Sequence, residues 1–145
     1  MRRNGWLIAA SALSAAAALL HVAVVFGGPG WYRFFGAGEE MAQAAERGSA
    51  APALITFAIA SLLLVAALYA LSGADVVRRL PLLRTGLVAI SAVYLLRGLA
   101  PVPMLLLAPA QLDAFALWSS AVVLVYGLVH AIGTRRAWAE LKRGR

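Results

Sequence analysis

Residues 5–26 read GWLIAASALSAAAALLHVAVVF, an apolar run of 22 residues that decides the fold. A helix rises about 1.5 Å per residue, so roughly 20 apolar residues cross the hydrocarbon core of a bilayer. Two arginines precede the run, as in a secretory signal peptide. The apolar core of a signal peptide, however, is only about 7–15 residues long. We therefore predict a retained transmembrane helix over residues 6–26.

The rest of the chain repeats this pattern. Hydrophobic residues make up 63% of the 145 residues and charged residues only 13%, whereas a soluble domain carries about 25% charged residues. Three further apolar stretches occupy residues 52–71, 82–100 and 114–133. The sequence therefore predicts an all-α, polytopic membrane protein: a four-helix transmembrane bundle forming a single domain over residues 1–145, with a short outer interfacial helix.

Positive charge is distributed unevenly between the two ends of these helices. Alternate connections and the termini hold ten Lys and Arg residues, namely Arg2, Arg3, Arg78, Arg79, Arg84, Arg135, Arg136, Lys142, Arg143 and Arg145, whereas the other connections hold only Arg33 and Arg47. The positive-inside rule then predicts an inner (cytoplasmic) membrane protein with both termini cytoplasmic. The net charge of +7 suits a protein whose basic residues contact anionic membrane lipids. We therefore expect membrane lipids as partners and no nucleic-acid partner.

Two segments on the outer side depart from simple spans. Residues 27–51 contain GGPGWYRFFGAGEE, and GEEMAQAAERGS within them predicts a short helix with acidic residues in its first turn. After residue 100 the prolines Pro101, Pro103 and Pro109 remove backbone donors. We therefore predict that residues 101–112 are broken, interfacial or re-entrant, or else continue the third helix, and that residues 27–51 form an outer cap over them.

Ionisable residues inside a membrane protein need a partner or a function. The candidates for a ligand-binding site on the outer side are His21, Arg33, Glu39, Glu40 and Arg97. Arg97 needs a carboxylate, a carbonyl or water, and the sequence offers Glu39, Glu40, Glu46 and Asp113 for an ion pair that fastens the outer loop. Alternatively, Arg97 and Arg33 bind an anionic ligand. His21 is either a proton acceptor in a cavity or a packed histidine bonded to a backbone carbonyl.

Cofactor chemistry has little support in this sequence. Absence of cysteine excludes disulfides and thiolate metal sites. His21 and His130 differ by about 15–20 Å in depth on this topology, which argues against a shared haem. We expect neither a cofactor nor a metal site.

The pattern of four short helices, with WYRFFGAGEE after the first one, resembles the small DoxX-like bacterial membrane proteins. The resemblance implies a four-helix membrane fold and transfers no catalytic residue. Small multidrug exporters are similar in size, but they depend on a carboxylate in the first helix, which this chain lacks.

These observations favour a protein that binds a small apolar or anionic molecule, or a lipid, in a cavity at the outer half of the bundle. One alternative is an accessory or assembly subunit of a larger membrane complex, or a homo-oligomer. Another is an intramembrane isomerase or lipid-modifying enzyme in which His21 and Glu39 act as acid and base.

Overall fold

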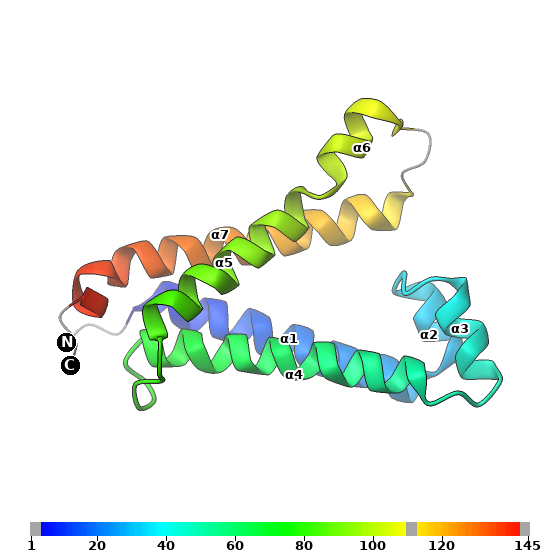
Figure 1. The fold of residues 1–145 in the computed structure, drawn as a ribbon, viewed down its shortest axis with the longest axis horizontal. Coiled ribbons are helices and arrows are strands. Elements are labelled where there is room, and N and C mark those ends of the chain that lie inside the picture. The colour runs from blue at the N-terminus through cyan, green and yellow to red at the C-terminus, as the bar shows by residue number, and fades with distance from the viewer. Residues whose placement is uncertain (1–3, 110–112, 143–145) are drawn as a thin grey trace. The chain divides into compact units, whose positions relative to one another are not determined.

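The computed structural model describes residues 4–109 and 113–142, and these ranges contain helices and no strand. The predicted all-α fold is thus confirmed. Of the predicted features, Arg2, Arg3, Arg143, Arg145 and the end of the segment 101–112 lie outside the described residues. The helices are α1 (Gly5–Gly27), α2 (Pro29–Phe34), α3 (Glu39–Glu46), α4 (Ala51–Gly73), α5 (Leu83–Leu99), α6 (Pro101–Leu107) and α7 (Ala114–Lys142) (Figure 1).

Four stretches of the described chain are long and apolar enough to cross a membrane: Gly5–Gly27, Ala51–Gly73, Leu83–Leu107 and Ala114–Leu141. They suggest a multi-pass membrane protein. The last helix was expected to end at Gly133 but continues to Lys142. Gly133 does not end this helix. A methyl group at Gly133 would lie 2.8 Å from Leu7 Cδ2, so the glycine permits α1 to approach α7 closely.

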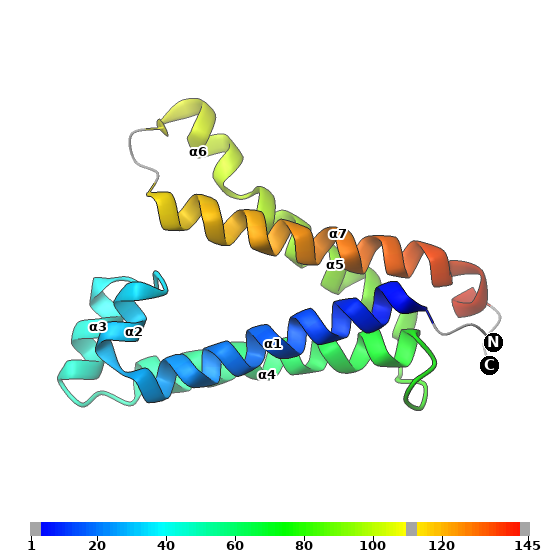
Figure 2. The same ribbon diagram turned by 180° about the vertical axis from the view of Figure 1, so that it is seen from behind.

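The chain divides into two compact units, described separately here: a first unit of Met1–Ser14 with Ala66–Arg145, and a second unit of Ala15–Val65. In the first unit, the start of α1, the end of α4, the start of α5 and the end of α7 meet at one end (Figures 1 and 2). Their shared core consists of Leu7, Ala10, Ala70, Ala74, Leu83, Leu87, Ala137 and Leu141. Asn4 reinforces this end, because its side chain donates to the Gly133 carbonyl at 2.8 Å.

Helices α5 and α7 pack antiparallel along their length, and two glycines fix their separation. A methyl group at Gly98 would lie 2.6 Å from Leu124 Cα, and one at Gly127 would lie 2.8 Å from the Leu95 backbone nitrogen. Each glycine therefore faces the backbone of the other helix. Small residues allow this close packing in membranes, where van der Waals contact replaces the hydrophobic effect between helices.

Residues 101–107 are helical, although we expected a break in regular structure there. Ala100 ends α5 and also precedes α6, and Pro101 occupies the first turn of α6. Proline suits that position because the first residues of a helix have no intrahelical acceptor for their N–H groups. The prolines thus separate two helices without unwinding the segment that follows. Most of α6 is exposed.

In the second unit, α2 packs against α3 around Val24, Tyr32 and Ala42. The short helix predicted from GEEMAQAAERGS is α3, and α2 is a further helix that we had not predicted. The turn between them needs positive φ angles, 67° at Gly36 and 95° at Gly38. Glycine adopts these angles without a steric penalty. The GAG sequence therefore reverses the chain and brings α3 back onto α2.

Candidate functional site

The residues predicted to form an outer site are divided between the two units. His21, Arg33, Glu39 and Glu40 belong to the second unit, whereas Arg97 belongs to the first. The predicted pairing of Arg97 with a carboxylate of residues 39–46, and the predicted cover over α6, remain predictions.

Arg33 is the centre of an ion-pair cluster within the second unit. Its Nε and Nη2 donate to the two carboxylate oxygens of Glu39 at 2.8 Å each, and its Nη1 donates to Glu46 at 2.7 Å. The hydrogen bonds to Glu39, then to Glu46, raise the pKa of Arg33 above its ordinary value. Two carboxylates therefore neutralise Arg33, and the cluster fastens α2 to α3. Glu40 is exposed on α3 and forms no part of this cluster.

Glu39 is expected to titrate well below the ordinary glutamate range. Hydrogen bonds from Arg33, and then from Gln43, lower its pKa from 4.5 to about 2. Because the folded pKa is the lower one, this interaction stabilises the cluster above pH 4.5 and is lost as the pH falls towards 2. An NMR titration of the Glu39 carboxyl carbon in micelles should show a midpoint near 2.

Arg33→Gln should move that midpoint back towards 4.5, whereas the matched control Glu40→Gln should leave it unchanged. A midpoint near 4.5 in the unmodified protein would show that Arg33 does not bind Glu39 in solution.

His21 is half-buried on α1, and its Nδ1 lies 2.7 Å from the Ala17 carbonyl oxygen. A carbonyl can only accept, so Nδ1 carries the proton and donates it. This is the packed histidine that we considered as one alternative. Within residues 15–65, all of which are described, no hydrogen bond joins His21 to Glu39. The enzyme alternative with His21 and Glu39 as acid and base remains a prediction.

Arg97 lies at the end of α5, where its Nη1 donates to the Ser120 hydroxyl of α7 at 2.7 Å. Asp113, one of its expected carboxylate partners, instead caps α7 by accepting from the Ala116 backbone nitrogen at 2.5 Å. Such a cap satisfies a donor in the first turn, which has no partner within the helix. Within the first unit, Arg97 therefore connects two helices through a hydroxyl group.

The first unit contains a buried polar network that we had not predicted from the sequence. Ser14 Oγ lies 3.0 Å from both Tyr94 OH and His130 Nε2, and the rings of Tyr94 and His130 are 5.1 Å apart. His130 is fully buried. Its Nδ1, like the Thr134 hydroxyl one turn later, has no hydrogen-bond partner among the residues that the structure describes. The network links α1, α5 and α7.

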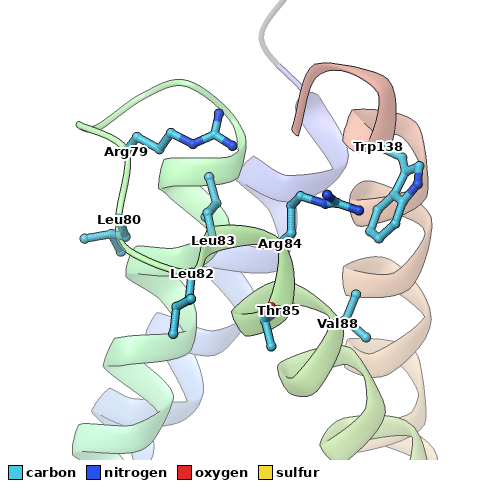
Figure 3. A pocket seen from close by; sticks show the side chains of 8 residues that line it. All are labelled: Arg79, Leu80, Leu82, Leu83, Arg84, Thr85, Val88 and Trp138. Carbon is cyan, nitrogen blue, oxygen red and sulfur yellow. The ribbon is translucent and has the colours of Figure 1, made fainter. Parts of the chain in front are cut away.

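A hollow of about 570 Å³ lies at the basic end of the first unit. Figure 3 shows Arg79 entering it from the loop before α5, and Arg84 extending towards the Trp138 ring. The guanidinium carbon of Arg84 is 4.7 Å from the ring centre, within the range of a cation–π interaction. The other residues that line this hollow are Leu80, Leu82, Leu83, Thr85 and Val88.

Three hydrogen bonds hold the loop that carries Arg79. The Ser72 hydroxyl donates to the Arg78 carbonyl at 3.1 Å and accepts from the Leu80 backbone nitrogen at 2.9 Å. Arg79 Nη2 donates to the Leu141 carbonyl at the end of α7 at 2.9 Å. The loop is thereby attached to both α4 and α7, which keeps Arg79 at the edge of the hollow.

A second hollow, of about 460 Å³, adjoins the first and is mainly apolar. Helix α5 contributes Val88, Ser91, Ala92 and Leu95, and α7 contributes Ala131, Thr134, Arg135 and Trp138. Both sets have the spacing i, i+3, i+4, i+7, which places each set on one face of its helix. Val88 and Trp138 border both hollows. Together the hollows combine cationic groups at one end with an apolar groove beyond.

From the sequence, we had interpreted Arg79 and Arg84 only as part of the uneven distribution of positive charge. Within residues 4–109 and 113–142, no group of three or more His, Cys, Asp or Glu side chains could hold a metal ion. Comparison with models of known protein families, with curated proteins and with solved structures finds no match to this chain. The DoxX-like resemblance remains a prediction.

Proposed function

We propose that this chain is a multi-pass protein of the bacterial inner membrane that binds a membrane lipid or a similar small amphiphile between α5 and α7. The observation that carries the proposal is the mainly apolar hollow of about 460 Å³ beside a hollow bordered by guanidinium groups. Both volumes fall in the range of about 300–1,000 Å³ that is typical of small-molecule sites. An amphiphile needs this combination, because its tail is apolar and its head is polar.

The excess of positive charge at this end supports its placement at the cytoplasmic face. We had expected the binding site at the outer half, lined by His21, Arg33, Glu39, Glu40 and Arg97. Two carboxylates occupy Arg33, and a backbone carbonyl occupies one nitrogen of His21, which leaves these side chains few free donors for a ligand. The proposal therefore places the site at the basic end of the first unit.

Filling the apolar hollow should reduce binding. Ala92→Phe places a large ring in the groove, and we expect it to weaken lipid binding by about tenfold, because one extra methylene in a hydrophobic pocket changes binding by about 1–3 kcal/mol. The assay is quenching of Trp138 fluorescence by phospholipids with brominated chains, added to the full chain in detergent micelles. Trp138→Phe gives the background signal of the other three tryptophans.

Ala89→Phe is the matched control, since Ala89 is an exposed residue of α5 that lines neither hollow. It should leave saturable quenching intact. Quenching that grows linearly with lipid content in every variant would indicate contact with bulk lipid and would refute the proposed site.

A further inference from the structure

Among the described residues, no acidic side chain forms an ion pair with the cations that line the two hollows. Arg79, Arg84 and Arg135 line the hollows, and no lining residue is acidic. Across the part of the chain that the structure describes, Arg33 is the only cation found in ion pairs. Arg33 of the second unit thus pairs with two carboxylates, whereas the arginines at the hollows pair with none that the structure describes.

The known contacts of these arginines also leave donors available. A guanidinium has five N–H donors. Arg79 uses Nη2 for the Leu141 carbonyl, and the guanidinium carbon of Arg84 lies over the Trp138 ring. Both side chains are thus positioned by the protein while N–H groups remain for a ligand. Guanidinium forks match the oxygens of a phosphate in a bidentate arrangement.

The depth of the hollows indicates what kind of phosphate compound fits. From Arg84 to Leu95, α5 rises roughly 16 Å, which is about half of the 30 Å hydrocarbon core. The cationic end and the apolar groove therefore span about one leaflet. A lipid of that leaflet would place its headgroup at Arg79 and Arg84 and one acyl chain along Val88, Ala92 and Leu95.

We propose that the site selects a phospholipid with a net anionic phosphate headgroup over a zwitterionic one. This inference rests on the proposed function and specifies the ligand class of the same site. The headgroup of a zwitterionic lipid carries an ammonium group beside its phosphate. This ammonium group would lie among guanidinium groups, and no acidic residue lines the hollows to pair with it. An anionic headgroup leaves the phosphate free to accept from both arginines.

The test compares brominated phosphatidylglycerol with brominated phosphatidylcholine in the Trp138 quenching assay on the full chain. We expect phosphatidylglycerol to bind about tenfold more tightly, because the guanidinium groups at the headgroup attract its net negative charge. The double variant Arg79→Gln with Arg84→Gln should lose this preference but keep saturable quenching by phosphatidylcholine. Retained quenching by phosphatidylcholine also shows that the variant is folded.

Arg78→Gln with Arg136→Gln is the matched control. It removes the same charge from the same end but alters neither hollow lining, so the preference should persist. Equal loss in both double variants would indicate general surface attraction and overturn the headgroup site. Equal, saturable binding of both lipids by the unmodified protein would refute the selectivity and leave the proposed function standing. Absence of saturable quenching by either lipid would refute both. Competition by millimolar inorganic phosphate would show a free-anion site and overturn the lipid assignment.

Discussion

Replacing Gly98 with valine is expected to lower the free energy of unfolding of the first unit by about 3 kcal/mol, at the upper end of overpacking costs. A β-carbon at this position would lie 2.6 Å from Leu124 Cα and 2.7 Å from the Leu124 backbone nitrogen. Backbone atoms cannot turn away as a side chain can, so α5 and α7 must separate. Valine gains roughly 0.5 kcal/mol over glycine in helix propensity, which is too little to offset this separation.

The measurement is unfolding in mixed micelles with increasing dodecyl sulfate, followed by circular dichroism. Gly5→Val is the matched control in the same unit, because a β-carbon at Gly5 meets no atom within 4 Å. It should change stability by less than about 0.5 kcal/mol. If the two variants proved equally stable, the contact between Gly98 and Leu124 would not hold α5 and α7 together.

The ends of the apolar helices are the part of this fold that the sequence predicts best. The thickness of the bilayer sets the length of an apolar helix, so the start and end of α1, α4 and α5 differ by no more than two residues from their predicted positions. We wrongly predicted that the last helix ends at Gly133, because a glycine that follows an apolar run commonly ends a helix. The actual contact of Gly133 is Leu7, more than a hundred residues away, and a hydropathy pattern carries no information about such distant contacts.

The candidate sites show the same division between local and distant information. Arg33 and Glu39 are six residues apart, and the sequence between them contains the glycines that form the turn. The ion pair between Arg33 and Glu39 could therefore have been predicted. We instead considered Glu39 as one of four carboxylates that could pair with the more distant Arg97. The hollow beside Trp138 depends on how α5 and α7 are aligned, and that alignment depends on Gly98 and Gly127. Charge patterning identified Arg79 and Arg84 but could not show that they border one hollow.

His130 is expected to contribute to stability through its volume more than through its hydrogen bond. It is fully buried, so His130→Ala would leave a cavity between α1, α5 and α7. Large-to-small changes at buried positions cost about 2–5 kcal/mol, and we expect a loss of about 3 kcal/mol in the dodecyl sulfate assay. The variant would also remove the contact between the Tyr94 and His130 rings.

His130→Phe separates volume from polarity, because phenylalanine restores a buried ring but has no ring nitrogen. It loses the bond to Ser14, and such bonds between membrane helices contribute about 0.6–2 kcal/mol. It also removes a buried Nδ1 that has no partner among the described residues, an arrangement that costs about 1–3 kcal/mol. These contributions have opposite signs and similar sizes, so His130→Phe should stay within about 1 kcal/mol of the unmodified protein.

A loss as large as that of His130→Ala would mean that Nδ1 is hydrogen-bonded in the membrane, for example to a buried water that Thr134 also contacts. Near-equal stability would instead mean that a buried ring of this volume, and not the ring nitrogens of histidine, stabilises this position.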